Sequence, residues 1–383
     1  MRGLARRHLS APAVAVCAPN AFKGTLGARA AATALGLGAC DAGARAIAVP
    51  VADGGDGTLD VLLAGSPGSR VTRHRVTGPN GTPVGARLGR LAGGEAVVEL
   101  AEASGLRLVR PAELDPVRAT SRGTGELLRL ALDAGHTRIV VGVGGSACTD
   151  GGAGLLQALG VHLTDSRGRE ISPGGAGLED LETIDLSEIH PALARCSIEV
   201  ACDVRSPLLG AQGPARMFAA QKGADPAAIE RLERALEHLV AVVSAAGYGE
   251  APNLPGAGAA GGCGFGLALI GARLMPGAQV VCDMVGLDAA LAGASLVMTG
   301  EGRLDLQTRT GKAPSEVAVR ARALGVRCVA ICGIVLDPLT ELFDAAISLD
   351  GLDPGVDPKR HTRALLRRAA ARATREALGA RAQ

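Results

Sequence analysis

Residues 138–152 read RIVVGVGGSACTDGG, an apolar run that leads directly into a loop of glycines, a serine and an aspartate. Similar loops, with a lysine or carboxylates among glycines, occur at NAFKGTL (20–26), VADGGDGT (51–58) and TGEGRLD (299–305), each after an apolar run. Glycine allows positive φ angles and a close approach of the backbone to a ligand. Free N–H groups at such turns bind anions, and the carboxylates suit Mg²⁺ or a substrate hydroxyl. Four such loops in one chain predict a site for phosphoryl transfer.

Short apolar runs recur along the chain and alternate with segments of helical pattern. The runs are 13–18, 46–51, 138–143, 197–202, 279–282, 295–299, 327–332 and 345–349, and the helical segments include 27–37, 123–134, 226–245, 314–324 and 362–377. Runs that are apolar on both faces and alternate with helices are typical of parallel strands covered on both sides. Residues 71–100 differ, because GPNGTP and AGG divide them into hairpin-like pieces. These pieces indicate an antiparallel or mixed sheet.

The length of the chain favours two domains. A chain of 383 residues exceeds what one hydrophobic core usually serves. We therefore expect a Rossmann/flavodoxin-like α/β domain with a parallel sheet, formed by residues 1–75 and 280–383. The second α/β domain, with a mixed sheet, is expected to be inserted between them as residues 76–279.

Composition argues against several classes of partner. Aromatic residues make up 1% of the chain and Trp is absent, so the stacking platforms of single-strand nucleic-acid binders are not expected. The net charge of +2 is too small to indicate a polyanionic partner, and no apolar segment reads as a membrane span. The start MRGLARRHLSAPAVAVC resembles a secretory or twin-arginine signal, but we interpret it as a tail before the first buried strand. Nine cysteines without a zinc-type spacing favour a reducing cytoplasm.

Two other glycine motifs, the Walker-type loop and the dinucleotide fingerprint, lack the neighbouring residues that they require. A Walker-type G-x-x-x-x-G-K-[ST] motif is absent, since Ala313 follows Gly311-Lys312. The run IVVGVGGSA is close to the dinucleotide fingerprint, but a helix opening there would contain glycines 151, 152 and 154. Each glycine inside a helix costs about 1 kcal/mol relative to alanine. An NAD(P)-dependent oxidoreductase is therefore kept only as an alternative.

Nine blocks of the sequence, in order from about residue 13 to 335, closely resemble the bacterial glycerate kinase family. They are APNAFKGTLGA, VPVADGGDGT, VTGPNGTPV, EAVVELAEASGL, the region RGTGELLRLALDAG to IVVGVGGSACTDGGAGLLQALG, ACDVRSPLLG, AAQKGA, PGAGAAGG and TGEGRLDLQTRTGK. The resemblance implies two α/β domains with an active site in the cleft between them. It also implies phosphorylation of D-glycerate with ATP and Mg²⁺, commonly to the 2-phosphate.

The chain departs from the family pattern at several positions. These are Asn20 and Ala21 for the usual Asp-Ser, Asp56 for Glu, Cys148 and Thr149 for Thr-Asn, Ser206 for Asn, and Ala219-Ala220 for Gly-Pro. It retains Lys23, Asp53, Asp150, Asp203, Lys222, Glu301, Asp305 and Lys312. The change at position 20 argues against an acid role there, and the other changes are compatible with a working site.

Phosphoryl transfer requires positioning, charge neutralisation and a group that accepts the hydroxyl proton. Asp203 is the leading candidate base, because it follows the buried-looking run IEVAC and would lie at the carboxyl end of a strand. Asp53 and Asp56 are the candidate Mg²⁺ ligands, and Arg303 could pair with a substrate carboxylate. The candidate catalytic residues are Lys23, Asp53 and Asp203; the candidate substrate-binding residues are Asp56, Glu301, Arg303, Asp305 and Lys312; the candidate phosphate-binding residues are Gly144, Gly145, Ser146, Asp150, Gly151, Gly152, Gln221 and Lys222. Each also has an ordinary interpretation as a turn, a helix cap or a surface ion pair.

The sequence thus predicts a cytoplasmic kinase that acts on the small molecules D-glycerate and ATP, with Mg²⁺ as cofactor. Three alternatives stay open: a kinase of another small hydroxy acid, the oxidoreductase described above, and a non-catalytic nucleotide-binding homologue, to which Asn20 points. Neither a nucleic acid nor a membrane is expected as a partner, and a homo-oligomer is compatible with the sequence.

Overall fold

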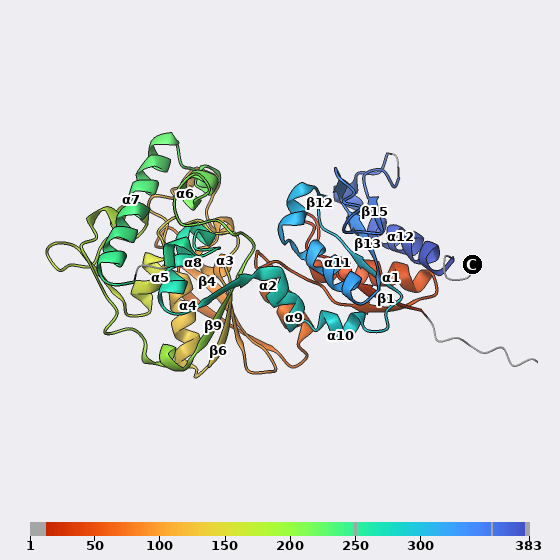
Figure 1. Ribbon diagram of the computed structural model, residues 1–383, viewed down its shortest axis with the longest axis horizontal. Coiled ribbons are helices and arrows are strands. Elements are labelled where there is room, and N and C mark those ends of the chain that lie inside the picture. Colours follow the sequence, from red (N-terminus) through yellow and green to blue (C-terminus); the bar gives the residue numbers. More distant parts are fainter. Residues whose placement is uncertain (1–12, 249–250, 354, 380–383) are drawn as a thin grey trace, which may run out of the picture. The chain divides into compact units, whose positions relative to one another are not determined.

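The computed structural model describes residues 13–248, 251–353 and 355–379 (Figure 1). The chain divides into two compact units: the first ends at Val51 and resumes at Gly286, and the second is Ala52–Val285. Residues 52–75 and 280–285, which we expected in the first domain, therefore belong to the second unit. For the first segment the reason is strand pairing, since Arg70–Thr77 pairs along its whole length with Pro83–Arg90. For the second segment it is the packing of the helix Gly277–Met284 on strands of the second unit. The basic start of the chain lies outside the described residues, and the expected strand after it is present at Val14–Cys17.

The first unit contains a five-stranded, fully parallel sheet in the order β15-β13-β11-β1-β2. Its strands are β1 (Val14–Cys17), β2 (Arg45–Ala48), β11 (Leu296–Thr299), β13 (Arg327–Cys332) and β15 (Ala345–Ser348). Numbered along this unit alone, the order is 2-1-3-4-5, the flavodoxin-like arrangement. The Rossmann/flavodoxin-like parallel sheet predicted from the sequence is thus confirmed. The strand order reverses between β1 and β11, which is where such sheets bind ligands.

Helices cover this sheet. They are α1 (Ala28–Asp41), α10 (Leu287–Leu291), α11 (Ala313–Ala323) and α12 (Pro358–Gly379), and a short two-stranded sheet joins β12 (Arg303–Leu304) to β14 (Ile334–Val335). Helices α1 and α12 pack on each other and share one core with β1, β11 and β13, centred on Leu35, Met298 and Leu366. Alternate strand residues such as Val297 and Ala330 are also buried, so both faces of the sheet are covered, as the apolar runs predicted.

The second unit contains a six-stranded mixed sheet in the order β10-β9-β6-β5-β4-β3. Its strands are β3 (Arg70–Thr77), β4 (Pro83–Arg90), β5 (Ala96–Glu99), β6 (Arg138–Gly142), β9 (Ser197–Cys202) and β10 (Arg273–Pro276). Strands β5, β6, β9 and β10 are parallel, and β3 and β4 form the antiparallel hairpin edge. The predicted mixed sheet and its hairpin within residues 71–100 are confirmed.

The predicted strand 279–282 is wrong. These residues lie in the helix α9 (Gly277–Met284), where Val280, Val281 and Cys282 are buried. A four-residue apolar run is compatible with either a strand or one buried turn of helix, so the pattern alone could not distinguish them. The strand that does occupy this edge of the sheet, β10, lies just before the run.

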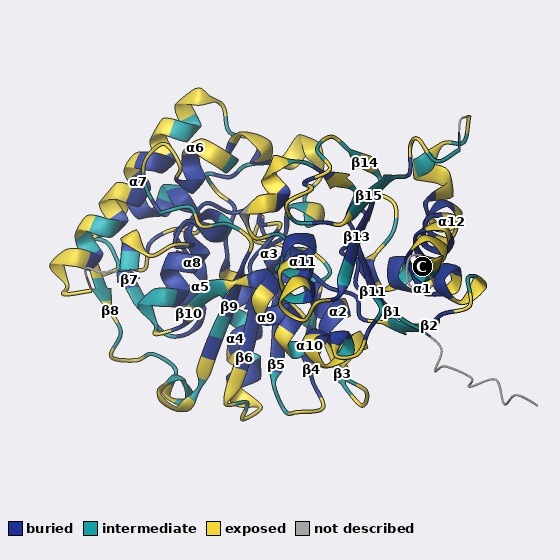
Figure 2. Cartoon of the chain, turned by 45° about the vertical axis from the view of Figure 1, so that its right-hand side comes forward, coloured by how far each residue is buried: buried dark blue, intermediate teal, exposed yellow. Residues whose placement is uncertain are grey.

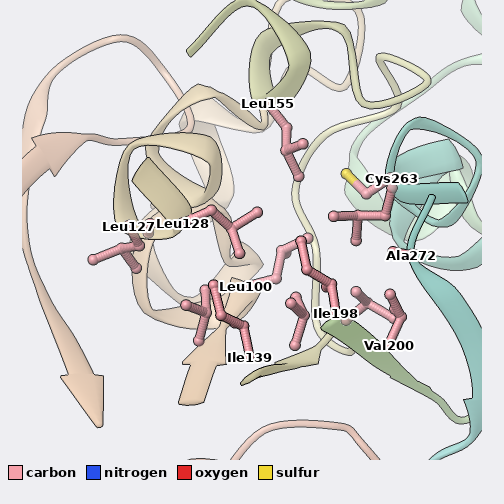
Figure 3. Close-up of a cluster of buried hydrophobic side chains, with 14 of the residues drawn as sticks. Leu100, Leu127, Leu128, Ile139, Leu155, Ile198, Val200, Cys263 and Ala272 are labelled. Atoms are coloured by element: carbon pink, nitrogen blue, oxygen red, sulfur yellow. The ribbon is translucent and has the colours of Figure 1, made fainter. Parts of the chain in front are cut away.

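Helices of the second unit build two cores. They are α2 (Thr58–Gly65), α3 (Leu100–Ser104), α4 (Arg122–Asp133), α5 (Ala153–Ala158), α6 (Pro214–Phe218), α7 (Pro226–Ala245) and α8 (Ala259–Leu269), beside a small hairpin of β7 (His162–Thr164) and β8 (Thr183–Asp185). One core joins the sheet to α4 and α8, with Leu100, Leu127, Ile139 and Val200 inside it (Figure 3). The other joins α5, α7 and α8 through Leu156, Leu236 and Phe265. Exposed residues lie on the outer face of helices such as α7, whereas the central strands β5, β6 and β9 are largely buried (Figure 2). No helix among the described residues is long and apolar enough to span a membrane.

Candidate functional site

Three loops of the second unit meet at the carboxyl edge of its parallel strands. The Gly144 N–H, just after β6, donates to the Gly54 carbonyl at 3.1 Å, and the Val143 N–H donates to the Ala201 carbonyl of β9 at 3.4 Å. A Cβ at Gly54 would lie 2.2 Å from that same carbonyl oxygen, so only glycine permits this approach. The loops that carry Asp53, Asp56, Ser146 and Asp203 are therefore brought together, although they are up to 150 residues apart in sequence.

The carboxylate of Asp56 lies against the backbone of Gly145. A Cβ at Gly145 would be 2.4 Å from Asp56 Oδ1, and the backbone has φ +71°. Gly145 is exposed, and no described residue accepts a hydrogen bond from its N–H. This turn presents a donor to solvent beside a carboxylate. A phosphate would fit such a turn if a cation lay between it and the carboxylate.

Glu99, at the carboxyl end of β5, holds the 53–57 loop in place. Its side-chain oxygens accept hydrogen bonds from the Gly57 N–H at 3.0 Å and from the Leu59 N–H at 2.9 Å, at the start of α2. Burial raises the pKa of Glu99, with Asp56 adding to the effect. Sequence reasoning missed this residue. The signal was its position directly after the apolar run AVV, the same strand-end rule that selected Asp203.

Lys222 lies inside the second unit and supports the glycine loop. Its Nζ donates to Ser146 Oγ at 2.8 Å and to the Cys148 carbonyl at 2.6 Å, and only 3% of the residue is exposed. Burial lowers the pKa of this ammonium group. Lys222 thus contacts the loop predicted to bind phosphate, while its neighbour Gln221 is exposed.

Asp150 is fully buried and serves the fold around it. Its carboxylate accepts hydrogen bonds from the N–H and hydroxyl of Ser121, both at 2.8 Å, and from the N–H groups of Gly152 at 3.1 Å and Gly154 at 3.4 Å. Burial raises its pKa, and these hydrogen bonds oppose that shift. The Gly151 N–H donates to the Gly261 carbonyl. The N–H groups of Gly151 and Gly152, which we expected to bind phosphate, therefore already donate hydrogen bonds within the protein.

The loop between β6 and α5 does not fit the dinucleotide-binding alternative. A dinucleotide fingerprint requires the helix to open on the glycines that follow the strand. Here β6 ends at Gly142 and α5 begins only at Ala153, after Gly151 and Gly152 have both adopted positive φ. The local geometry lacks the strand-to-helix turn that holds a pyrophosphate.

The carboxylates expected to act in catalysis are accessible. Asp53 is half-buried, and its Oδ1 accepts a weak hydrogen bond of 3.4 Å from the Gly55 N–H. Asp203 follows β9 and is exposed. Mg²⁺ commonly uses one or two protein carboxylates and completes its shell with water and substrate phosphates. Asp53 and Asp56, three residues apart on one loop, fit that donor requirement.

The first unit brings a second group of predicted residues together at its switch point. The Asn20 N–H, after β1, donates to the Gly300 carbonyl, after β11, at 2.8 Å. Asn20 is buried, and a Cβ at Gly302 would lie 3.7 Å from the backbone nitrogen of Lys23. The 20–26 and 299–305 loops are thus adjacent, and the exposed Lys23 lies at the edge where open α/β sheets carry their sites.

Glu301 and its neighbours form a polar cluster beside this loop. Glu301 accepts a hydrogen bond from Thr308 Oγ1 at 2.9 Å, and Lys312 Nζ lies 3.8 Å from Glu301 Oε1. Arg303 is exposed and pairs through Nε with Asp305 at 3.1 Å. Asp305 also caps the 3₁₀ turn Leu306–Thr310. Asp305 therefore has a structural task, whereas Arg303 presents its guanidinium to solvent.

Comparison with known proteins gives a consistent result. The model of the glycerate kinase family matches residues 15–377. Glycerate 2-kinase of Escherichia coli (strain K12) is 44% identical over 327 residues, which cover 84% of this chain and 85% of that protein. Glycerate kinase of Bacillus subtilis (strain 168) is 41% identical over 348 residues, 90% of this chain and 91% of that protein. The crystal structure of a candidate glycerate kinase 2 from Salmonella typhimurium LT2 superimposes with a TM-score of 0.86, at 40% identity, over 97% of this chain and 100% of that one.

Proposed function

Because the chain belongs to the glycerate kinase family, we propose that it transfers the γ-phosphoryl group of ATP to a hydroxyl of D-glycerate, with 2-phosphoglycerate as the favoured product. The chain is a kinase, and the acceptor and regiochemistry are the proposed part. The observation that supports this most is the meeting of the 53–57, 143–147 and 201–203 loops at one edge of a parallel sheet. That edge combines accessible carboxylates with an anion-binding turn.

Asp203 is the proposed base. It lies at the carboxyl end of β9, and its side chain is exposed to solvent and hence to a substrate. In phosphoryl transfer such a carboxylate accepts the proton of the attacking hydroxyl, while the rest of the site supplies positioning and charge neutralisation. Burial raises the pKa of the neighbouring Cys202 thiol to about 12, with Asp203 adding to the effect. The thiol therefore stays protonated and does not compete as a base.

The turn at Gly145 and Ser146 is proposed to hold the phosphates. The exposed Gly145 N–H would donate to a phosphate oxygen, and Lys222 would keep Ser146 and the loop backbone in place from beneath. When bound, Mg²⁺ would be held by Asp53 and Asp56 and would neutralise phosphate charge. Without a cation, the Asp56 carboxylate beside Gly145 would repel the phosphate.

In the first unit, Lys23 and Arg303 are proposed to bind substrate anions. Both are exposed, and a guanidinium can hold a carboxylate through two hydrogen bonds. Arg303 would then share its charge between the substrate and Asp305. Glu301 and Lys312 support the loop through their contact. We also propose the cytoplasm as the location, since none of the nine cysteines is in a disulfide.

The test is coupled ADP release by the purified protein with MgATP and D-glycerate, with L-glycerate, glycerol and no acceptor as comparisons. Release should require D-glycerate, and Asp203→Asn should lower kcat by at least about 10²-fold, in the range of general-base catalysis. The exposed Asp180→Asn is the matched control and should leave turnover unchanged. Turnover that survives in Asp203→Asn would reject the base. ATP binding without release for any hydroxy acid would reject the kinase reaction and favour a non-catalytic homologue.

A further inference from the structure

Two cysteines and an aspartate meet beneath the glycine loop of the second unit. Cys148 Sγ lies 3.8 Å from Cys263 Sγ, and a carboxylate oxygen of Asp150 lies within 4.8 Å of both sulfurs. All three residues are buried. Cys148 and Asp150 belong to the loop and Cys263 belongs to α8, where it faces the core beside Leu155 (Figure 3). We infer that these residues form a site for a thiophilic divalent cation of the Zn²⁺ class.

The separation of the sulfurs fits this cation. A tetrahedral centre with Zn–S bonds of about 2.3 Å places two sulfur ligands about 3.8 Å apart. The observed 3.8 Å thus equals the tetrahedral edge. Asp150 is the third candidate ligand, with a carboxylate oxygen within 4.8 Å of both sulfurs. Two thiols in simple contact would also show this distance, so the surroundings of the sulfurs decide between the two cases.

Asp150 is held as a metal-binding carboxylate usually is. Its Oδ2 is turned towards Ser121 by two hydrogen bonds, while its Oδ1 accepts one bond from the Gly152 N–H. A carboxylate oxygen can accept two such interactions, so Oδ1 keeps a coordination position. Hydrogen bonds of this kind orient metal ligands and are part of most metal sites.

The charge around the site is balanced. Two thiolates and one carboxylate carry three negative charges, so a bound divalent cation would leave the site with one net negative charge. The buried Lys222 ammonium supplies the matching positive charge, because it donates to the Cys148 carbonyl at 2.6 Å and interacts electrostatically with Cys148, Cys263 and Asp150. Buried charge is tolerated when it is compensated in this way.

The same segment also contains a buried hydroxyl without a hydrogen-bond partner in the described part of the chain. Thr149, between two of the proposed ligands in sequence, is fully buried, and its hydroxyl has no hydrogen-bond partner among the described residues. Buried hydroxyls are normally paired. Because Cys148 and Thr149 replace the usual residues of the family, the site is expected in this chain and not as a general property of its relatives.

The inference is tested with Cd²⁺, which binds like Zn²⁺ and gives an ultraviolet charge-transfer band with thiolates. The full-length protein is reduced with a phosphine, freed of excess reductant and titrated with Cd²⁺. One equivalent should produce the band and release the thiol protons, and Zn²⁺ should displace it. Cys148→Thr and Cys263→Ala should each abolish the band, and Asp150→Asn should weaken Cd²⁺ binding at least about tenfold. Circular dichroism verifies that each variant is folded.

The matched control is Cys40→Ser, since Cys40 is an exposed cysteine that could bind Cd²⁺ adventitiously. This variant should keep the full band. Absence of the band in the unmodified protein, even after refolding in the presence of the cation, would overturn the site. A band that persists in Cys148→Thr and disappears in Cys40→Ser would also overturn the site. These readouts do not depend on kinase activity, so their failure is distinguishable from failure of the proposed function.

Discussion

The substitution Gly145→Ala tests the proposed phosphate turn most directly. The added Cβ would lie 2.4 Å from Asp56 Oδ1, whereas ordinary contacts begin at 3.4 Å. Asp56 is exposed, so its side chain can give way, and the carboxylate must move by about 1 Å. A displacement of that size in a catalytic site costs about 10²-fold in rate, equivalent to about 2.7 kcal/mol in the activation free energy.

The substitution also has a backbone cost that must be separated from this effect. Gly145 has φ +71°, and a residue with a Cβ pays about 1 kcal/mol or somewhat more in that region. Gly94→Ala is the matched control, because Gly94 has φ +93° and no atom within 4 Å of the new Cβ. Both variants should therefore lose a similar free energy of unfolding, while only Gly145→Ala should lose activity.

The assay is steady-state ADP release at varied MgATP, beside urea unfolding of both variants. We expect kcat/KM for MgATP to fall about 10²-fold in Gly145→Ala and to stay within about twofold in Gly94→Ala. If Gly145→Ala kept the kcat/KM of Gly94→Ala while losing the same stability, the contact between Asp56 and the turn would have no part in catalysis. The phosphate assignment at Gly145 would then be refuted.

Two further predictions concern stability. Glu99→Leu removes the acceptor of two backbone N–H groups at the start of α2 and should lower the free energy of unfolding by about 2 kcal/mol; Glu99→Gln keeps one acceptor oxygen and should lose less, so equal losses would contradict the anchoring role. Arg169 lowers the pKa of Asp165 from its ordinary value of 3.8 to about 2 through a side-chain hydrogen bond. The ionised carboxylate therefore stabilises the folded state fully at pH values above 3.8, and this stabilisation is lost as the pH falls towards 2. The difference in unfolding free energy between the wild type and Asp165→Asn should therefore shrink between pH values of about 6 and 3, and a constant difference would disprove the linkage.

The strand and helix pattern could largely be predicted from the sequence because its signals are local. The runs AVAVCA and IVVGV became β1 and β6, and the segment 226–245 became α7. Periodicity and apolar length suffice where a segment is long or bounded by clear turns. They failed at 279–282, where one buried turn of helix has the same composition as a strand. They also could not assign residues 52–75, because the pairing of β3 with β4 decides which sheet this segment joins.

The candidate site was predictable as a set of loops, but not as an arrangement. Apolar runs located Gly145 and Asp203 after β6 and β9, which are neighbouring parallel strands whose carboxyl ends share one edge. Asp53 follows β2 of the other sheet, so its place beside them came only from the contact of Gly54 with Gly144. The direction in which each side chain points was not available from the sequence. Asp150 and Lys222 look as available for a phosphate as Gly145 does, yet both are buried and hold the loop from inside, whereas Gly145 is exposed.

The sequence by itself determined the class of fold and the family, since both depend on the order of local motifs along the chain. Only the tertiary structure decided which loops meet and which polar groups face solvent. Cys148 and Cys263 are 115 residues apart in the chain, and Glu99 reaches the start of α2 from about 40 positions away. Such contacts depend on the order and register of strands, which are set by burial over a whole sheet. No local pattern of residues contains that information.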